Sequence, residues 1–305
     1  MDLYDDRYGF PGFFELRRCD NCGHVFLPND FSPDQLCELY SRYYPRASFN
    51  VDEYTPHKRL RGFCGWLNGD ASAAFLWVPP HVKVLDIGCG FGQSLGYLQS
   101  RGCEVYGVEA DDNIHRVAEK FGFKVHLGLF DPDVYEPGCF DFVTMNQVIE
   151  HVTDPGKMLR GVARILKSRG GVVLTTPNIQ GAGARIFGKK WINWHAPYHL
   201  QFFTRESMRL AAARAGLRLV CMRTMTSSSW LHYQWAHLVT CPPPGTPSKF
   251  WAGWAVGKRS EIDGRMKFLL KMLGLLHQGK LNHVLTRLSD AVNMGDNYLF
   301  ILEKI

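Results

Sequence analysis

The feature that most constrains this chain is a short apolar run that ends in an acid and then in three alternating glycines. The run covers residues 82–87, with Asp86 near its end, and Gly88, Gly90 and Gly92 follow directly. Such a run is typical of a strand buried on both faces of a parallel sheet. The glycines allow a sharp turn and let a ligand lie against the main chain. The residues after Gly92 begin a helix, whose unpaired N–H groups favour a carboxylate or phosphate. We therefore predict a strand, a tight loop and a helix that bind a nucleotide-like ligand.

Strands and helices alternate from this loop onward. This alternation predicts an α/β fold with a doubly wound, seven-stranded, mostly parallel sheet, whose ligand lies at the carboxyl ends of the strands. The predicted strands cover residues 82–87, 104–109, 124–127, 140–145, 171–176, 217–222 and 297–302. We expect the last of them at the edge of the sheet.

Four regions follow from this pattern. Residues 79–225 are the predicted ligand-binding core, and residues 1–78 are an N-terminal extension with helices. Apolar residues recur at helical spacing between His57 and Leu76, which predicts a helix or a broken pair of helices with a core-facing apolar side. Residues 226–296 are a helical insert, and residues 297–305 are the last core strand. An insert of this length is either a lid over the substrate or a dimer surface, and the sequence leaves both open.

The composition limits the classes of function. Hydrophobic residues make up 46% and charged residues 21% of the 305 residues, and no apolar run reaches the length of a membrane span. The acidic residues 1–6 do not resemble a secretory signal, so we expect a cytoplasmic protein. The net charge of +6 is not gathered in a dense basic run, which disfavours nucleic acid as a partner.

Cys19 and Cys22 form one half of a zinc knuckle, with Gly23 in the turn. A structural zinc ion needs four ligands, and the sequence has no second Cys-x-x-Cys pair. We therefore favour an unmetallated turn and predict no metal site.

The spacing between Asp86 and Glu109 narrows the choice of ligand. An acid at the end of the second strand, about 20 residues after a glycine loop, can accept hydrogen bonds from ribose hydroxyls. Two cofactors fit this device: NAD and S-adenosylmethionine.

The residues 84–92 resemble motif I of class I S-adenosylmethionine-dependent methyltransferases, in which an acid precedes Gly-x-Gly-x-Gly. The stretch 140–155 is similar to the fourth-strand segment of the same family. Gly170–Gly171, Thr176–Asn178 and the stretch 197–204 resemble the subgroup of quinone-type O-methyltransferases and sugar C-methyltransferases. The half knuckle resembles the start of the sugar C-methyltransferases. The resemblance covers about residues 80–225 and the last strand.

The resemblance implies a set of cofactor contacts, with S-adenosyl-L-methionine as the cofactor. The methionine part would contact Asp86, Gly88, Cys89, Gly90 and Gly92, together with Asn146 and Gln147. The ribose would lie on Glu109 and the adenine near Ala110, with Asp131 or the backbone of Leu129 beside the adenine amine.

Methyl transfer to a hydroxyl also needs a base. Glu150 and His151 directly follow the fourth strand, and imidazole titrates near neutral pH. A second group lies in the stretch 191–200, where His195 and His199 stand among two tryptophans and a tyrosine. This stretch is either an aromatic wall for a substrate or a loop packed as a small core, and His151 is either a base or a structural residue.

We expect a methyltransferase that acts on a small molecule, at oxygen ahead of carbon, with a homodimer as one role for the insert. The alternatives are a C-methyltransferase of a nucleotide sugar, a non-catalytic cofactor-binding or scaffold protein, and an NAD-dependent oxidoreductase.

Overall fold

The structure is a computed structural model. It describes residues 2–28, 31–32, 35, 38–43, 50–251 and 263–305. The part of the predicted insert at residues 252–262 therefore lies outside the described residues.

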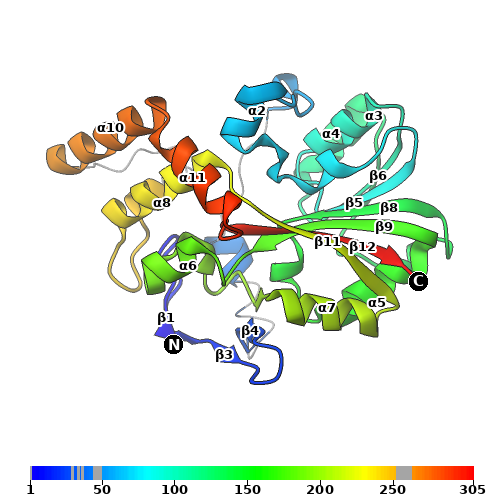
Figure 1. Cartoon of the computed structure of the whole chain (residues 1–305), viewed down its shortest axis with the longest axis horizontal. Helices are drawn as coiled ribbons and strands as arrows, with labels where there is room; N and C mark the ends of the chain where they lie inside the picture. The colour runs from blue at the N-terminus through cyan, green and yellow to red at the C-terminus, as the bar shows by residue number, and fades with distance from the viewer. Residues whose placement is uncertain (1, 29–30, 33–34, 36–37, 44–49, 252–262) are drawn as a thin grey trace.

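One seven-stranded sheet organises the molecule (Figure 1). Its strands run in the order β11-β12-β9-β8-β5-β6-β7. All pairs from β9 to β7 are parallel, whereas β12 is antiparallel to both of its neighbours. The predicted doubly wound, mostly parallel sheet is thus confirmed. The strands are β5 (Lys83–Ile87), β6 (Glu104–Glu109), β7 (Lys124–Leu127), β8 (Phe140–Asn146), β9 (Leu166–Pro177), β11 (Leu217–Met225) and β12 (Asn297–Lys304).

The expected place of the last strand was wrong. Strand β12 lies between β9 and β11, and β11 forms the edge. The reason is visible in burial: Leu299 and Phe300 are adjacent in sequence, point to opposite faces and are both fully buried. In strand β11 only Leu217 and Thr224 are buried, and Val220 is 53% exposed, as suits an edge.

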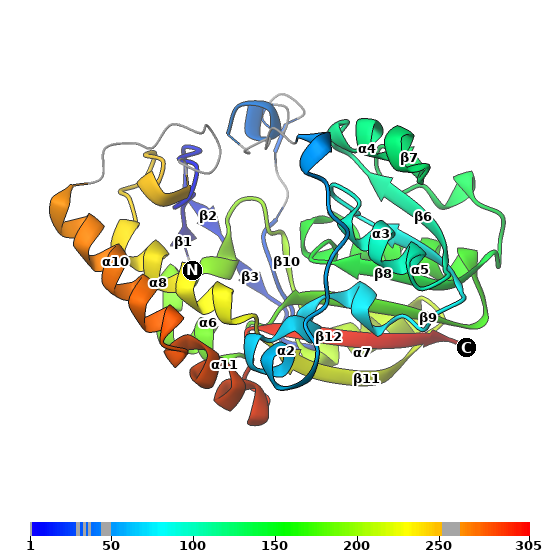
Figure 2. The same ribbon diagram turned by 90° about the horizontal axis from the view of Figure 1, so that it is seen from above.

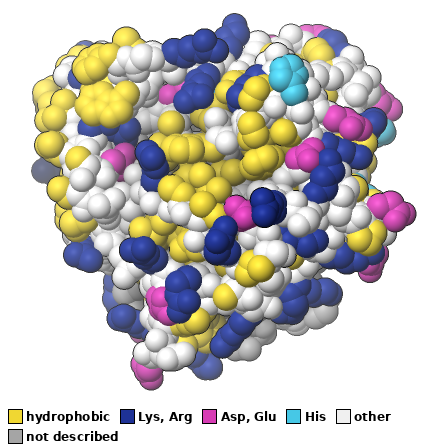
Figure 3. Space-filling model, turned by 45° about the vertical axis from the view of Figure 1, so that its right-hand side comes forward, with side chains coloured by type: hydrophobic (Ala, Val, Ile, Leu, Met, Phe, Trp, Pro, Cys, Tyr) yellow, Lys and Arg dark blue, Asp and Glu magenta, His cyan; other side chains and the backbone are white. Residues whose placement is uncertain are grey.

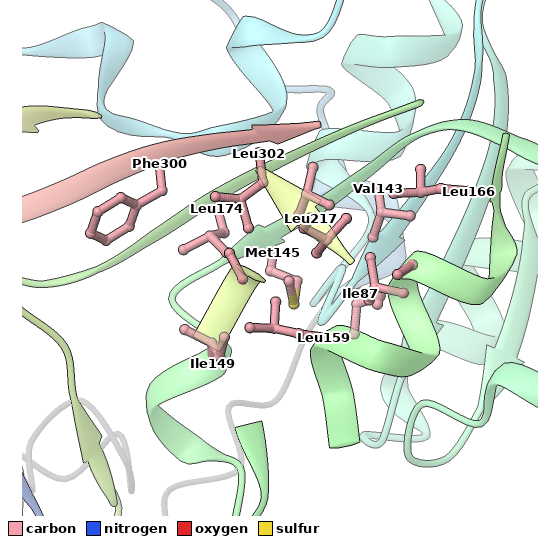
Figure 4. Packing of buried hydrophobic residues seen from close by; sticks show 14 of the residues in the cluster. Ile87, Val143, Met145, Ile149, Leu159, Leu166, Leu174, Leu217, Phe300 and Leu302 are labelled. Carbon is pink, nitrogen blue, oxygen red and sulfur yellow. The ribbon is translucent and has the colours of Figure 1, made fainter. Parts of the chain in front are cut away.

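Helices cover both faces of the sheet. Figure 1 shows α3 (Gln93–Gln99) and α4 (Asn113–Phe121) on one side and α5 (Pro155–Ile165) and α7 (Arg205–Arg214) on the other. The largest apolar core lies between the sheet and α5. Figure 4 shows side chains of β5, β8, β9, β12 and α5 meeting there, among them Ile87, Met145, Leu159 and Leu302.

The N-terminal extension is tied to the core by a small sheet. Its strand β4 (Val25–Phe26) pairs with β10 (Gln201–Phe202) of the core on one side and with β3 (Arg17–Arg18) on the other, while β1 (Asp2–Leu3) pairs with β2 (Phe14–Glu15). The knuckle turn joins β3 to β4. The Cys19 N–H donates to the carbonyl of His24, and the Thr204 hydroxyl donates to the carbonyl of Cys22 at 2.8 Å. Within the described residues, no group of three potential metal ligands includes either cysteine.

The predicted helix between residues 57 and 76 is a broken set. It consists of α2 (Gly62–Asn68) and the 3-10 helices η3 (Asp70–Ser72) and η4 (Ala74–Trp77). Residues of η4 are buried as expected. The expectation of a core-facing side fails for α2 and the segment before it, since Leu60 is 50% and Phe63 is 70% exposed. The spacing of apolar residues predicts which side of a helix is apolar, but it does not predict whether another part of the protein packs on that side.

The described part of the insert is helical. It contains α8 (Ser228–Thr240), α10 (Gly264–Gln278) and α11 (Leu281–Ala291). Figure 2 shows these helices beside one another, away from α3 and α4. The shorter helices of the chain are η1 (Leu39–Tyr43), η2 (Val51–Glu53), η5 (Pro132–Val134), η6 (Ile149–His151), α6 (Ala182–Phe187), η7 (Gly188–Lys190) and η8 (Ile192–Trp194).

Candidate active site

The glycine loop between β5 and α3 has the backbone that its sequence predicts. Gly88, Gly90 and Gly92 all have positive φ, at 73°, 53° and 75°. A Cβ on Gly88 would lie 2.5 Å from the Cγ2 of Val148, so this glycine is needed for packing. A Cβ on Gly90 would meet nothing within 4 Å. The loop is therefore packed on one side and open on the other, and a ligand can approach its backbone at Gly90.

Glu109 lies directly against this loop, as the spacing predicts. Its carboxylate accepts the N–H of Gly90 at 2.8 Å. Its other oxygen accepts the N–H groups of Ala110 and Asp111, at 2.8 and 3.0 Å. Strand β6 thus ends in a carboxylate held by three backbone donors, at the edge of the sheet where ligands bind.

Asp86 is buried beneath the loop. Its two oxygens accept the hydroxyls of Ser94 on α3 and Thr144 on β8, each at 2.5 Å. Burial raises the pKa of Asp86 to about 6, although both hydroxyls act to lower it. The carboxyl group therefore joins β5, β8 and the start of α3 and sets the position of the loop.

The other residues predicted near the methionine part differ in which of their atoms are available to a ligand. The side chain of Cys89 is buried and packs near Gly107, so this residue offers its backbone to the loop. The Asn146 side-chain oxygen accepts from the N–H of Ala74 and the hydroxyl of Thr175, both at 3.0 Å. Gln147 has a φ of 57°. This left-handed conformation is uncommon for a residue other than glycine.

On the adenine side, the structure distinguishes the Asp131 side chain from the backbone of Leu129. The N–H of Gly128 donates to the carbonyl of Glu109 at 2.8 Å, which holds the backbone before Leu129 beside the expected ribose position. Asp131 instead accepts the N–H of Asp133 at 2.9 Å and caps η5. The backbone of Leu129 is therefore the better placed of the two.

The four predicted catalytic residues come together. A carboxyl oxygen of Glu150 and one ring nitrogen each of His151 and His199 lie within 4.8 Å of one another. The ring of His199 is 4.6 Å from that of His151 and 4.9 Å from that of His195, measured between centroids. Helix η6 supplies the first two residues, and the stretch 191–200 supplies the other two. Val148, one residue before η6, is the side chain that packs on Gly88, so this group adjoins the glycine loop.

Hydrogen bonds fix the tautomers of two of these histidines. His151 Nδ1 lies 3.0 Å from the carbonyl oxygen of Tyr198, and His199 Nδ1 lies 2.8 Å from that of Asn193. A carbonyl only accepts, so each Nδ1 carries the hydrogen and each Nε2 keeps a lone pair. Burial lowers the pKa of His151 to about 4 and holds the pKa of His199 and His195 well below the usual value. These imidazoles are therefore neutral at pH 7 and can accept a proton or bind a divalent cation.

Glu150 has the opposite shift. It is fully buried, and within the described residues neither of its carboxyl oxygens has a hydrogen-bond partner. Burial raises the pKa of Glu150 to about 8. A buried carboxyl group beside two imidazole nitrogens responds to their charge, because a positive imidazolium nearby would lower the pKa of Glu150 and favour loss of its proton to solvent.

The stretch 191–200 is packed as a small core, which is one of the two alternatives left open by the sequence. All ten residues are buried, and they form a second apolar cluster with the N-terminal extension. The carboxylate of Asp296 accepts the indole N–H of Trp191 at 2.8 Å and the amide of Asn193 at 2.9 Å. Helix α8 packs on it through Gln234, whose side chain bonds to the backbone of Ile192.

Sequence reasoning missed the residues that close this cluster from the N-terminal side. Arg7 is 5% exposed, donates to the carbonyl of Ile192 and lies 4.4 Å above the ring of Trp251. Tyr8 meets the rings of His195 and Tyr198 at 5.7 and 5.5 Å. Arg7 and Tyr8 belong to no recognisable motif. A single sequence carries no signal that residues so near its start contact the stretch 191–200.

Two cavities of the molecule lie elsewhere. One of about 660 Å³ lies between α2 and the end of α3, and one of about 360 Å³ lies between α7 and the edge strand β11. Neither is lined by a residue of the catalytic group.

A family of proteins described as the methyltransferase domain matches residues 35–222, more than half of the chain. The chain belongs to this family. It is a class I S-adenosylmethionine-dependent methyltransferase, in agreement with the strand order and the glycine loop. The alternatives of an NAD-dependent oxidoreductase and of a non-catalytic protein are not favoured.

Similar proteins are known among curated methyltransferases. A ubiquinone biosynthesis O-methyltransferase of Cupriavidus pinatubonensis is 29% identical over 175 residues, which cover 53% of this chain and 68% of the relative. A protein of the same name from Thiobacillus denitrificans is 34% identical over 103 residues, 32% of this chain and 44% of the relative.

Solved structures are more distant. A SAM-dependent methyltransferase of Archaeoglobus fulgidus is 19% identical with a TM-score of 0.44, covering 76% of this chain and 88% of that one. A geranyl diphosphate C-methyltransferase of Streptomyces coelicolor A3(2) is 16% identical with a TM-score of 0.46, covering 76% of each chain. The fold assignment rests on the strand order of this chain itself.

The cofactor of this methyltransferase is S-adenosylmethionine. The residues present fit this cofactor. No protein atom lies within 4 Å of the position of a Cβ on Gly90, so a ligand can contact the backbone there, and the carboxylate of Glu109 lies beside this position. In the part of the chain that the structure describes, no helix has both the length and the apolar character needed to cross a membrane.

Proposed function

We propose that this methyltransferase transfers a methyl group to an oxygen of a small-molecule acceptor, with a histidine as general base. The observation that carries the proposal is the convergence of Glu150, His151 and His199 beside the glycine loop. Transfer to oxygen is also the reaction in the names of the relatives from two bacteria. C-methylation of a nucleotide sugar is the rival outcome of the assay below.

The cofactor contacts belong to the same proposal. The backbone of Gly88–Gly92 and the side chains of Asn146 and Gln147 would hold the methionine part, with Asp86 positioning the loop from below. The carboxylate of Glu109 would exchange its backbone N–H partners for the ribose hydroxyls. The adenine would lie by Ala110 and the backbone of Leu129, with Asp131 shaping the turn beside it.

When bound, the cofactor supplies a methyl group already activated on a sulfonium. The residues of this chain then have two tasks. The first is to hold the acceptor oxygen in line, which contributes several kcal/mol by orientation alone. The second is to take the acceptor proton, and the lone pair on Nε2 of His151 or His199 is the group to do so. Before turnover Glu150 loses its own proton to solvent, and its carboxylate then stabilises the imidazolium that forms when the histidine takes the acceptor proton.

The test is an assay of purified enzyme with the cofactor and two acceptors: catechol, which offers phenolic oxygens, and a thymidine-diphosphate sugar. We expect methyl on oxygen of the phenol, located by mass spectrometry and NMR. His151→Ala should lower kcat by about 10²–10⁴-fold while calorimetry shows unchanged cofactor affinity. Methyl on a sugar carbon, or an unchanged kcat in both His151→Ala and His199→Ala, would contradict the proposal.

The region boundaries and partners stay predictions of the same kind. We propose the division into residues 1–78, 79–225, 226–296 and 297–305, a cytoplasmic location, a role in small-molecule or natural-product biosynthesis, and a homodimer as one use of the insert. No nucleic-acid partner is expected. On the face in Figure 3, Lys and Arg side chains are spread among apolar and polar ones and do not gather in one patch, which supports that expectation.

A further inference from the structure

Helix α11 has its polar side inward and its apolar side outward. Its buried residues are Asn282, His283, Thr286 and Arg287. His283 bonds to the side chain of Asn68 at 2.8 Å, and Arg287 donates to the carbonyl of Trp66 at 2.9 Å. A surface helix of a globular protein has the reverse arrangement. The side turned outward consists of Leu281, Val284, Leu285, Leu288 and Val292, which are 44%, 49%, 40%, 60% and 64% exposed.

Two neighbouring helices extend this apolar surface. Helix α10 has no buried residue, and its exposed apolar side chains are spaced to share one side. They are Phe268, Leu269, Met272, Leu275 and Leu276. On α2, the rings of Phe63 and Trp66 lie 5.5 Å apart and are 70% and 58% exposed. The hydrogen bonds from His283 and Arg287 hold α11 against α2, and Figures 1 and 2 both show α10, α11 and α2 on one side of the molecule.

Positive charge accompanies this surface. Helix α10 has no acidic residue, and the only acid within residues 264–292 is Asp290, which pairs with the buried Arg287 at 2.8 Å. Asp263, just before α10, caps that helix through the N–H of Met266. The exposed cations are Arg265, Lys267, Lys271 and Lys280 of the insert and Lys58, Arg59 and Arg61 before α2.

We propose that the outward side of α10, α11 and α2 binds the surface of an anionic lipid bilayer, with the helices lying in its plane. Leucine, phenylalanine and tryptophan side chains enter the boundary of the acyl chains, while lysine and arginine reach the headgroups. An exposed apolar surface flanked by charged side chains is of the kind that marks a membrane or protein interaction site. A second copy fits less well, because two-fold symmetry would bring the cations of α10 toward their own copies without acids to match them.

The test measures sedimentation of the full chain with unilamellar vesicles of phosphatidylcholine alone and of equal phosphatidylcholine and phosphatidylglycerol. We expect binding to the anionic vesicles that is about tenfold or more stronger than to the neutral ones and that weakens as salt rises. Leu285→Glu/Leu288→Glu should abolish binding, and Lys267→Glu/Lys271→Glu should weaken it by about tenfold or more. Val220→Glu, an equally exposed change on strand β11, serves as the matched control and should leave binding unchanged.

Light scattering on the same samples decides between the two occupants. Equal binding to both vesicle types, or no binding, would overturn the proposal. If in addition the wild type is a dimer that Leu285→Glu/Leu288→Glu turns into a monomer, the surface is a contact between copies. Cofactor affinity is measured on every variant and should not change, so failure here leaves the proposed methyl transfer untouched.

Discussion

At the scale of single residues, the site combines an acid that is hard to ionise with bases that are hard to protonate. Burial raises the pKa of Glu150 to about 8 and lowers that of His151 to about 4. Between these values both groups are neutral. In the proposed reaction Glu150 first loses its proton to solvent, and its carboxylate then stabilises the imidazolium that forms when the histidine takes the acceptor proton. The dependence of rate on pH follows from this coupling.

We expect kcat/KM for methyl transfer to rise as pH increases through about 8, because the raised pKa keeps Glu150 protonated below that value. Glu150→Gln removes the ionisable group and should leave a lower rate without that rise. The measurement is a pH–rate profile of both proteins. An unchanged profile in Glu150→Gln would assign the ionisation to another group.

Substitutions of two loop glycines should distinguish a loss of packing from a loss of cofactor binding. Gly88→Ala places a Cβ against Val148 at positive φ and should lower the free energy of unfolding by about 1–3 kcal/mol. Gly90 also has a positive φ, so Gly90→Ala should lower the free energy of unfolding too. Its added methyl group meets no protein atom and instead occupies space beside the loop backbone, so it should weaken binding of S-adenosylhomocysteine. Thermal unfolding and calorimetry distinguish the two. Equal cofactor affinity in wild type and Gly90→Ala would place the cofactor elsewhere.

At the scale of elements, three segments far apart in the sequence form the walls of the site: the N-terminal residues, the stretch 191–200 and helix α8. Local pattern could predict the strands, the glycine loop and the placement of Glu109, because strand ends and loop chemistry are encoded within a few residues. It could also bring Glu150 and His151 to the sheet edge. It could not show that the stretch 191–200 is buried, since Arg7, Trp251 and Asp296 cover it only through tertiary contacts.

Asp5 orders the N-terminal segment over this site. Its side chain accepts the N–H groups of Arg7, Tyr8 and Phe10 at 2.9–3.0 Å, and it is fully buried. Asp5→Ala leaves these buried donors unsatisfied and should cost about 2–5 kcal/mol of unfolding free energy. Asp5→Asn keeps one acceptor oxygen and should cost less. Denaturant titration of both variants checks this ranking, and equal stability of Asp5→Ala and wild type would refute it.

At the scale of the whole molecule, buried carboxyl groups set how stability depends on pH. Burial raises the pKa of Asp296 to about 7 and of Glu150 to about 8, above the ordinary values of 3.8 and 4.5. A group whose pKa is raised by folding stabilises the protein at low pH, and this stability is lost as pH rises through the folded-state pKa. The buried histidines act oppositely, but their contribution is complete above about pH 6.5.

We therefore expect the melting temperature to fall between pH 6.5 and 8, with each still-protonated carboxyl contributing about 1.4 kcal/mol per pH unit. Glu150→Gln should flatten the fall, because an amide does not titrate. Differential scanning calorimetry across this range makes the comparison. A melting temperature that rises with pH in the wild type would contradict the expected sign.

The pairing of β11 with β12 has a consequence for the architecture of this enzyme. Met225 and Asn297, the last and first residues of these antiparallel strands, are register partners, so the chain leaves the sheet and returns to it at the same point. Antiparallel neighbours can be joined by a two-residue turn. We therefore expect that residues 226–296 can be replaced as one segment without breaking the sheet. A chain that replaces them with Asn-Gly should keep the sheet and the glycine loop, and with them the grip on the methyl donor, while it loses Asp296 and α8 beneath the aromatic loop. In that case the part of the chain that we expect to hold the methyl donor does not depend on the segment that supports the aromatic stretch.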